Sequence, residues 1–340
     1  NQGSGDVTVL NAADGKLLNT VKTGEGALGI SLSEAPKFDM AGLTGWKDTI
    51  VKKLTGGVGQ LLKAAKVRAI DGWAKFEDAK TCTVETSDGE TLKIKAENVV
   101  LATGSVEVEL PFLPFGGKII GSTGALELTE LPQKTVVVGA GYIGLELGIA
   151  FRKLGSDVTF IEALDRILPL YDKALTDPVA KWLTSHGVEL HLGARAGGFG
   201  DGKLSITTRD GAPMQIAADK VLVTVGRRPR TQGWGLENMG VAMAGPFVKI
   251  DQRCATSMKN VWAVGDLTGE PMLAHKGSAQ GEVVAEIIAG HDRIFGGEGD
   301  DAVDGGNDDD TIWGGGGNDT IRSGGMDDLI LAGEDHDLVM

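Results

Sequence analysis

Strand and helix patterns follow one another in the middle of the chain. Val136 to Val138 form an apolar run without alternation, which is typical of a parallel strand covered on both faces. The pattern then favours a helix from about Tyr142 to Leu154 that ends at Gly155, followed by a strand from Asp157 to Glu162. A strand, a helix and a strand in this order predict an α/β domain built on a parallel sheet.

The turn between the first strand and this helix is rich in glycine. Gly139 permits a tight reversal, Gly141 lets the backbone approach a pyrophosphate, and Gly144 lets the helix lie close to the strand. The helix also presents unpaired N–H groups and its positive dipole end to phosphates. Glu162 follows Gly144 by 18 residues, near the ~20-residue spacing of an acid that meets the adenosine ribose, so it should favour NAD over NADP. We therefore predict a dinucleotide site, with a structural βαβ unit as the alternative.

The segments before this unit predict simpler elements. Residues 41 to 64 have a helical pattern, which we expect to be interrupted at Gly56 and Gly57. Residues 67 to 100 alternate like an antiparallel meander, with a hairpin tip at Asp88 and Gly89. Residues 1–27 read as a hairpin and resemble one blade repeat of the YVTN type of β-propeller. Because such repeats bury their faces only against neighbours, a single copy is assigned no chemistry.

Three further stretches stand out around the glycine turn. They are NVVLATGSVEVELP at 98 to 111, VLVTVGRRPRTQG at 221 to 233, and NVWAVGDLTGEPMLAHKGSAQGEVVAE at 260 to 286. Together with GYIGLELG they resemble the flavoprotein disulfide reductase family, in its dihydrolipoamide dehydrogenase branch, over roughly Leu28 to His291. The resemblance implies a partial FAD domain at 28–130, an NAD-binding domain at 131–250 and a return to the FAD domain at 251–291.

The same resemblance implies which residues contact the cofactors. Asp266 follows an apolar strand, where its carboxylate can accept from a ribityl hydroxyl; the alternative is that it caps the turn into the next helix. His275 is expected to form a wall of the flavin site rather than to act as a base. The implied NAD contacts are Gly139, Ala140, Gly141, Tyr142, Ile143, Gly144, Leu145, Glu146, Glu162 and Gly226. The implied FAD contacts are Gly72, Thr103, Gly104, Ser105, Asp266, Met272, Leu273, Ala274 and His275.

Three features of this family are missing from the sequence. A second GxGxxG after a strand is not found before residue 130, because GGVGQL at 56 to 61 follows a helical stretch. The family has a closely spaced redox pair of cysteines, whereas Cys82 and Cys254 lie 172 residues apart and read as packing residues. The dimerisation domain that supplies a catalytic His and Glu is also not found. We therefore assign no catalytic residue and expect no family-type homodimer.

The composition changes after His291. From Asp292 to Met340 there are 12 Asp and 2 Glu against 2 Arg, which accounts for −12 of the net charge of −14. From Gly296 onward the segment divides into five nonapeptides with Asp at the sixth position and Val or Ile at the eighth. The stretch IIAGHDRIF at 287–295 keeps the same phase. The pattern resembles the RTX repeat, GGxGxDxUx, which forms a calcium-filled parallel β-roll.

The physics of the repeat explains its spacing. Each nonapeptide supplies a glycine-rich turn and a short strand, and two of them make one turn of a solenoid. Sixth-position carboxylates and turn carbonyls then converge on a hard cation, while the eighth-position aliphatic side chains form the core. A solvated acidic tail is the alternative, but the strict register favours the repeat. The expected Ca²⁺ ligands are Asp292, Asp301, Asp310, Asp319, Asp328 and Asp337.

Length and composition narrow the partners. The chain has 340 residues and is 41% hydrophobic, enough for a sizeable core. It has no signal-peptide pattern and no apolar run near the ~20 residues of a membrane span, and its acidity argues against nucleic acid. The expected partners are NAD(H) and calcium ions. Two compartments are compatible with the sequence: a functional calcium-binding repeat indicates an extracellular protein, whereas the reductase ancestry indicates a cytoplasmic one.

The sequence therefore predicts an α/β fold with a Rossmann-type NAD-binding domain and a partial FAD domain, followed by a parallel β-roll over 292–340. Three functions fit it: an FAD/NAD oxidoreductase core without lipoamide turnover, a calcium-binding secreted or structural protein with an inert reductase-like segment, and a nucleotide-binding remnant. The three-part pattern is compatible with a natural gene, an engineered fusion and a composite of separate proteins.

Overall fold

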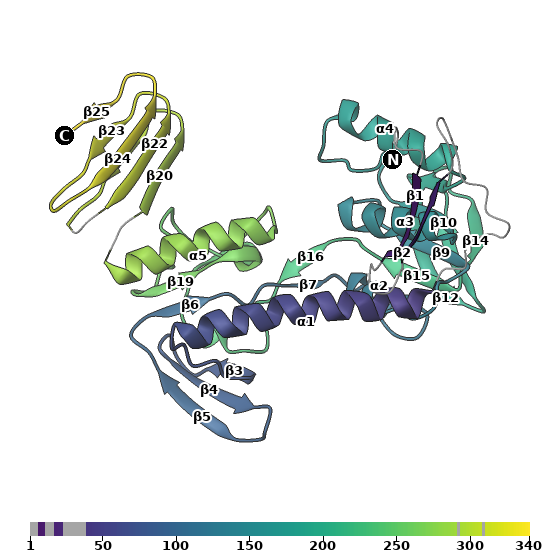
Figure 1. Ribbon diagram of the computed structural model, residues 1–340, viewed down its shortest axis with the longest axis horizontal. Helices are drawn as coiled ribbons and strands as arrows, with labels where there is room; N and C mark the ends of the chain where they lie inside the picture. The colour runs from purple at the N-terminus through teal and green to yellow at the C-terminus, as the bar shows by residue number, and fades with distance from the viewer. Residues whose placement is uncertain (1–5, 11–16, 23–38, 291–292, 308–309) are drawn as a thin grey trace. The chain divides into compact units, whose positions relative to one another are not determined.

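The computed structural model describes residues 6–10, 17–22, 39–290, 293–307 and 310–340. The chain forms two compact units, whose elements are labelled in Figure 1. Unit 1 contains Asn1–Arg68 and Glu107–Gly226, and unit 2 contains Ala69–Val106 and Arg227–Met340. Unit 1 thus includes residues 107–130, which the sequence assigned to an FAD domain, and excludes 227–250, which it assigned to the NAD-binding domain.

Unit 1 is built on a five-stranded parallel sheet with the order β11-β10-β9-β15-β8. The helix α3 (Tyr142–Leu154) connects β9 to β10, and α4 (Lys173–Ser185) connects β10 to β11. The chain then returns on the other side of β9 as β15, so the strand order reverses between β9 and β15. The strands are β8 (Ile119–Ile120), β9 (Lys134–Val138), β10 (Asp157–Glu162), β11 (Glu189–Leu192) and β15 (Lys220–Val223).

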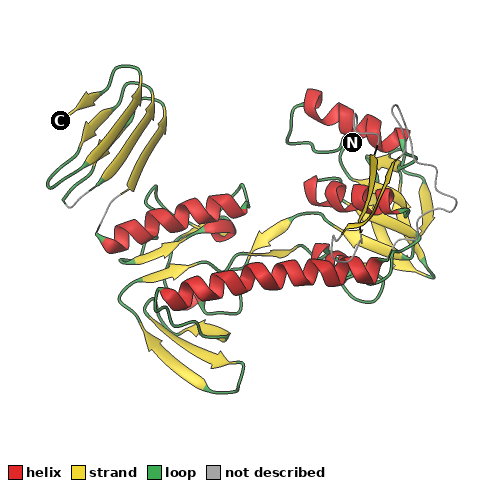
Figure 2. Cartoon of the chain, viewed as in Figure 1, coloured by secondary structure: helices red, strands yellow, loops and turns green. Residues whose placement is uncertain are grey.

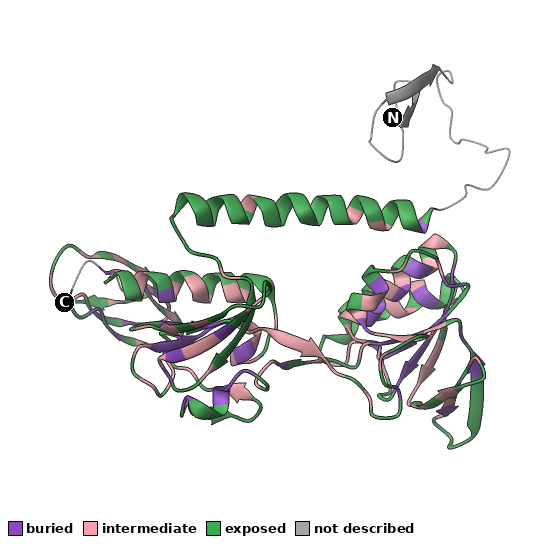
Figure 3. Ribbon diagram, turned by 90° about the horizontal axis from the view of Figure 1, so that it is seen from below, coloured by how far each residue is buried: buried purple, intermediate pink, exposed green. Residues whose placement is uncertain are grey.

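The two faces of this sheet are covered by different elements. On one face, Val137 and Phe160 pack with Leu145 of α3 and with residues of α4. On the other, Val136 packs with Leu204 in a meander of β12 (Arg195–Gly200), β13 (Lys203–Thr207) and β14 (Pro213–Ala217). Figure 3 shows the buried strands between these covers. Burial on both faces explains why β9 has an apolar run without alternation. The predicted bounds of α3 and β10 are confirmed.

A 25-residue helix, α1 (Met40–Ala64), precedes the sheet, and the short helix α2 (Ser122–Leu126) lies between β8 and β9. The Asp39 carboxylate caps α1 by accepting from Gly42 N at 2.9 Å. The predicted interruption at Gly56 and Gly57 is wrong, because α1 continues through both residues (Figure 2). A glycine inside a helix costs only about 1 kcal/mol relative to alanine, which the turns on either side can tolerate.

The amino-terminal strands β1 (Asp6–Leu10) and β2 (Leu17–Lys22) pair antiparallel, as the hairpin pattern predicts. The predicted turn between them lies outside the described residues. The resemblance to a propeller blade stays a prediction.

Unit 2 contains a parallel pair of strands, β6 (Val99–Leu101) and β19 (Val261–Ala263). The predicted meander is confirmed as β3 (Gly72–Phe76), β4 (Thr81–Thr86) and β5 (Thr91–Lys95), with Gly89 at the tip in the left-handed region, φ +86°. The shorter elements around them are β7 (Ser105–Glu107), β16 (Arg227–Pro229), η1 (Leu236–Asn238), β17 (Met243–Ala244), β18 (Phe247–Val248) and η2 (Gly265–Thr268). The helix α5 (Ala274–Ala289) follows.

Residues 293–340, the repeat segment, form two parallel three-stranded sheets, β20-β22-β24 and β21-β23-β25. Ile294 pairs with Ile312 and Ile312 with Ile330, an offset of 18 residues, so two nonapeptides make one turn as predicted. Ile312 and Ile321, both at the eighth position of their nonapeptides, are fully buried. The strands are β20 (Arg293–Glu298), β21 (Ala302–Asp304), β22 (Thr311–Gly316), β23 (Thr320–Arg322), β24 (Leu329–Glu334) and β25 (Leu338–Val339).

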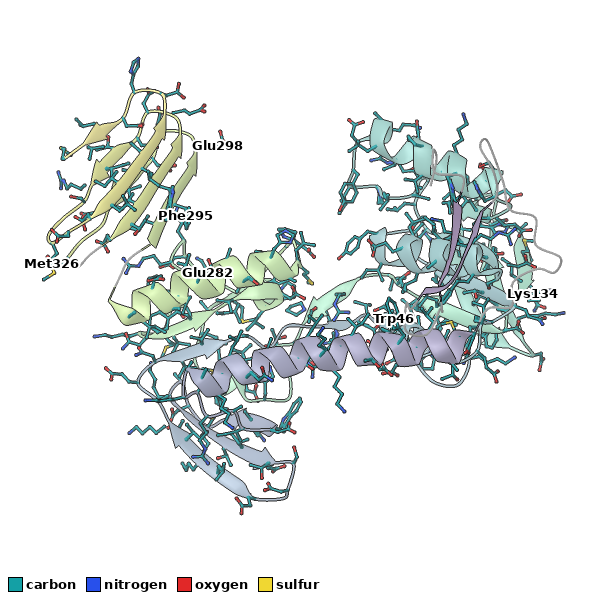
Figure 4. All side chains as sticks on the ribbon, in the orientation of Figure 1. Trp46, Lys134, Glu282, Phe295, Glu298 and Met326 are labelled. Carbon is teal, nitrogen blue, oxygen red and sulfur yellow. The ribbon has the colours of Figure 1, made fainter. Side chains whose placement is uncertain are left out.

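Two details refine the expected repeat. The stretch at 287–295 keeps phase in sequence, but residues 287–289 are the last turn of α5, so the strands begin only at β20. Phe295, labelled in Figure 4, stacks on Trp313 with ring centroids 4.7 Å apart.

Among the described residues, every helix is too short or too polar to cross a lipid bilayer.

Candidate functional site

The glycine turn after β9 is closed on one side by protein and open on the other. Gly139 has φ +100°, and a Cβ added there would lie 2.6 Å from the Thr224 carbonyl oxygen. A Cβ on Gly144 would lie 2.3 Å from the Gly139 carbonyl oxygen, so α3 approaches β9 as the sequence predicts. At Gly141, by contrast, no heavy atom lies within 4 Å of the Cβ position. The open side therefore leaves room for a ligand against the backbone.

The turn lies where the strand order reverses. Thr224, which follows β15, donates from its N to Val138 O at 2.8 Å and from Oγ1 to Gly139 O at 3.1 Å. Gly226, with φ +131°, comes two residues later. Within the described residues, no side chain caps the first turn of α3, which leaves its N–H groups for an anion. Open α/β sheets bind their ligands at such a reversal, at the carboxyl ends of the strands.

Glu162 at the end of β10 holds this turn in place. It is only 9% exposed, and its Oε2 accepts from Ala140 N at 2.7 Å while Oε1 accepts from Leu164 N at 2.9 Å. A carboxylate has about four acceptor positions, so it can still accept from sugar hydroxyls. The sequence predicted Glu162 beside the glycine turn, but not its bond to the turn's own backbone.

The other predicted NAD contacts divide into two kinds. Ala140 and Leu145 have buried side chains in the sheet core, so only their backbone can face a ligand. Tyr142 and Glu146 are exposed and Ile143 is half-buried at the start of α3. The site therefore depends on backbone groups from 139 to 144 more than on side chains.

A second cluster lies in unit 2, at the carboxyl ends of β6 and β19. Val264 N donates to Leu101 O at 3.0 Å and joins the two strand ends. Ser105 Oγ then donates to Asp266 Oδ2 at 2.5 Å. The structure thus brings together Ser105 and Asp266, two of the predicted FAD contacts. The N-caps of η2 and α5 are Val264 and Leu273, so the alternative that Asp266 is a helix cap is wrong.

The remaining predicted FAD contacts have mixed positions. Met272 and Leu273 lead into α5, while Ala274 and His275 are exposed in its first turn. The same helix holds the Asp266 turn, because Gln280 Oε1 accepts from Gly265 N at 2.7 Å. Gly72, however, is explained by strand pairing: a Cβ there would lie 2.3 Å from Glu85 O of β4.

Two residues that the sequence analysis missed complete this cluster. Arg227 donates from Nε to Ser105 Oγ at 2.8 Å and from Nη2 to Ser105 O at 3.0 Å. Gln280 is the second, through its bond to Gly265 N. Arg227 and its neighbour Arg228 have the same local pattern, so only a contact across 122 residues of chain distinguishes them.

The two cysteines are free and are not placed as a redox pair. Cys82 lies in β4 and is half-buried, whereas Cys254 is 4% exposed and packs with Trp262 and Val284. Burial raises the pKa of Cys254 to about 11, and burial also raises the pKa of Cys82. Because the thiolate is the nucleophile, both thiols are poorly reactive near neutral pH.

Alkylation with iodoacetamide at pH 8 should therefore leave Cys254 unmodified in the folded chain and label Cys82 only slowly. Peptide mass spectrometry measures each site, and the same reaction in denaturant, where both should react fully, is the control. Rapid labelling of Cys254 in the folded protein would show an activated thiol and contradict a packing role.

The sixth-position aspartates of the repeat segment form two rows. Asp301 N donates to Asp319 Oδ1 and Asp319 N to Asp337 Oδ1, each at 2.9 Å, which joins residues one solenoid turn apart. The other row joins Asp310 N to Asp328 Oδ1 at 3.0 Å. Asp292 lies outside the described residues. The predicted ligands therefore alternate between two sides of the solenoid.

The second carboxylate oxygens in the first row lie beside the glycine positions of the turns. Oδ2 of Asp301 and of Asp319 is buried without a hydrogen-bond partner in the described part of the chain. At Gly314 an added Cβ would lie 2.5 Å from Asp319 Oδ2 and 2.1 Å from Ala332 O. Among the described residues, no three His, Cys, Asp or Glu side chains gather as metal ligands. A cation here would be held by single carboxylates together with carbonyl oxygens, which suits calcium.

Two known protein families match the chain, one over the core and one over the repeat segment. The pyridine nucleotide-disulphide oxidoreductase family matches residues 2–281, and the RTX calcium-binding nonapeptide repeat (4 copies) matches 288–321 and 304–339. The first match begins ahead of Leu28, where the sequence resemblance was placed. The core is thus similar to a reductase, and a calcium-binding repeat region follows it.

Two curated relatives are dihydrolipoyl dehydrogenases. That of Pseudomonas aeruginosa is 52% identical over 289 residues, which cover 84% of this chain and 62% of the relative. That of Geobacillus stearothermophilus is 44% identical over 264 residues, which cover 76% of this chain and 56% of the relative. The chain therefore spans less than two thirds of the length of these relatives.

Solved structures have the same fold. The HOCl-induced flavoprotein disulfide reductase RclA from Escherichia coli has a TM-score of 0.68 at 28% identity, covering 74% of this chain and 58% of that chain. LpdA from Mycobacterium tuberculosis has a TM-score of 0.68 at 25% identity, covering 75% and 57%.

Proposed function

Because the chain belongs to the pyridine nucleotide-disulphide oxidoreductase family, we propose that it is a dihydrolipoyl dehydrogenase-like core that retains NAD(H) binding and has lost lipoamide turnover. The observation that carries this proposal is the glycine turn at 139–144, open at Gly141 and held by the buried carboxylate of Glu162. The family implies FAD and NAD(P) binding, so the question is which cofactor the residues of this chain fit.

The residues of unit 1 fit a dinucleotide in a Rossmann-type domain. The backbone of 139–144 would face the pyrophosphate, with the N-terminus of α3 supplying N–H donors. The Glu162 carboxylate would accept from the adenosine ribose and would repel a 2′-phosphate, which favours NAD over NADP. Gly226 would border the ligand from the neighbouring strand end.

The residues of unit 2 fit only part of FAD. Asp266, held by Ser105, would accept from a ribityl hydroxyl, and the start of α5 would border the flavin. A second glycine-rich phosphate turn after a strand is not found in residues 39–290. We therefore propose that FAD binds weakly and below stoichiometry. Bound nicotinamide and flavin would exchange hydride. Cys82 and Cys254, however, do not form the redox cysteine pair that would exchange electrons with lipoamide.

The purified full chain should therefore show no measurable NADH-dependent lipoamide reduction and less than stoichiometric flavin absorbance. Asp266→Ala should remove the residual FAD, because it deletes the carboxylate that would orient the ribityl chain, whereas Glu237→Gln, an exposed acid in unit 2, should not. Stoichiometric FAD in the wild type, or lipoamide turnover above a no-enzyme control, would contradict the proposal.

The repeat region favours a second function, calcium binding, in which the reductase-like core is inert. Its supporting observation is the pair of buried Oδ2 atoms on Asp301 and Asp319, which lie beside the glycine positions of the turns. A buried carboxylate oxygen without a hydrogen-bond partner costs free energy, and a cation would offset that cost. We propose that the segment is a parallel β-roll stabilised by Ca²⁺. NADH binding distinguishes the two functions, since an inert core would bind none.

A further inference from the structure

Arg227 makes a two-point contact with Ser105 beside the predicted flavin contact Asp266. Its Nε donates to Ser105 Oγ at 2.8 Å and its Nη2 donates to Ser105 O at 3.0 Å. All three residues belong to unit 2 and are half-buried, where hydrogen bonds to charged groups are stronger than in bulk water. The contact therefore fixes both the backbone and the side chain of Ser105.

The hydrogen bonds of this cluster can run in only one direction, from Arg227 through Ser105 to Asp266. A guanidinium only donates, so Ser105 Oγ must accept from Arg227. A hydroxyl carries a single hydrogen, which is then directed to Asp266 Oδ2 at 2.5 Å. An ionised carboxylate only accepts, so the relay ends at Asp266.

A purely structural role, in which Arg227 only holds two chain segments together, explains its contact with Ser105 less well. Two other hydrogen bonds already join the same chain segments: Arg230 N donates to Gly104 O at 2.8 Å, and Thr103 Oγ1 donates to Arg230 O at 2.9 Å. Arg227 adds a third contact to this backbone, at Ser105 O, and it alone among these bonds orients the Ser105 hydroxyl.

We propose that Arg227 is a positioning residue, which orients the Ser105 hydroxyl so that it holds Asp266 with Oδ1 directed to a hydroxyl of the flavin ribityl chain. This inference rests on the proposed function, in which unit 2 binds FAD. It assigns to Arg227 a role that acts through Ser105, rather than a direct charge contact with the cofactor phosphates.

A double-mutant cycle on the full chain tests the relay, with FAD as the ligand and flavin fluorescence as the measurement. Arg227→Gln and Ser105→Ala should each weaken FAD binding by about tenfold, and the double variant should be no weaker than the weaker single variant. Arg227→Lys should stay weakened, because an ammonium keeps the charge but not the two-point fork. The exposed neighbour Arg228→Gln is the matched control and should bind like the wild type.

The melting temperature of each FAD-free variant separates positioning from support of the fold. Positioning leaves that temperature at the Arg228→Gln value, whereas a structural role lowers it in parallel with FAD affinity. Three results would overturn the inference: additive losses of FAD affinity in the cycle, full FAD affinity in Arg227→Lys, or Arg227→Gln binding FAD like Arg228→Gln. Each of them would leave the proposed FAD site itself standing. No FAD binding by the wild type would instead overturn the proposed flavin site, and the positioning role with it.

Discussion

Chelating calcium from the full chain should abolish hydrogen-exchange protection in residues 311–334, and adding calcium should restore it. The repeat segment carries acidic side chains one solenoid turn apart, and Oδ2 of Asp301 and of Asp319 is buried without a hydrogen-bond partner in the described part of the chain. Extracellular calcium modules bind at ~10⁻⁴ to 10⁻³ M, so a titration to ~10 mM should complete the change. Mg²⁺ should restore little protection, because it demands near-octahedral ligands and sheds water reluctantly.

Substitutions of the repeat aspartates should raise the calcium midpoint more strongly where the carboxylate is more deeply buried. Asp319→Ala removes a carboxylate that is 1% exposed and bonded to Asp301 N, so it should raise the calcium midpoint strongly. Asp310→Ala, in the other row, should do the same. Asp337→Ala is the matched control, because this residue is only half-buried, and it should shift the midpoint less. Equal protection with and without calcium, or full protection by Mg²⁺, would contradict the calcium hypothesis.

Substituting Gly144 with valine should abolish NADH binding and destabilise unit 1. An added Cβ would lie 2.3 Å from Gly139 O and 2.5 Å from Thr224 Oγ1, so α3 would have to move away from β9. Overpacking of this kind costs about 1 to 3 kcal/mol of unfolding free energy, and the displaced helix would no longer present its N–H groups. Chemical denaturation and calorimetric titration with NADH measure the two effects.

Gly141→Val is the matched control for that substitution. Gly141 has φ −75°, which any residue adopts, and its Cβ position is open. The variant should keep the unfolding free energy within about 0.5 kcal/mol of the wild type. It should nevertheless weaken NADH binding at least about tenfold, because the side chain would occupy the space of the pyrophosphate. Unchanged NADH affinity in Gly141→Val would place the ligand elsewhere.

Local signals predicted the elements whose ends carry strong backbone preferences. The bounds of α3 were predictable because Gly141 precedes it and Gly155, with φ +111°, ends it. The 18-residue register of the repeat was predictable because Asp and aliphatic positions recur without exception. The same reasoning failed for α1, where Gly56 and Gly57 suggested an interruption that the helical turns on both sides override.

The sites were predictable only as far as a motif marks them. Asp266 and the segment 103–105 were implied by resemblance, and their strand ends do meet. Arg227 and Gln280 carry no local signal, because their roles depend on partners far along the chain. Gly72 shows that one residue can have two explanations: the close approach of β4 also requires a glycine there, so its contact with FAD stays a prediction.

Calorimetric titration of the full chain with NADH and with NADPH tests the central claim most directly. If the backbone of 139–144 and the Glu162 carboxylate form a dinucleotide site, NADH should bind and NADPH should bind more weakly. Glu162→Ala should narrow that difference by weakening NADH, both by losing the ribose acceptor and by releasing Ala140 N. No heat of binding for either nucleotide, or equal affinity for both, would contradict an NAD-binding core.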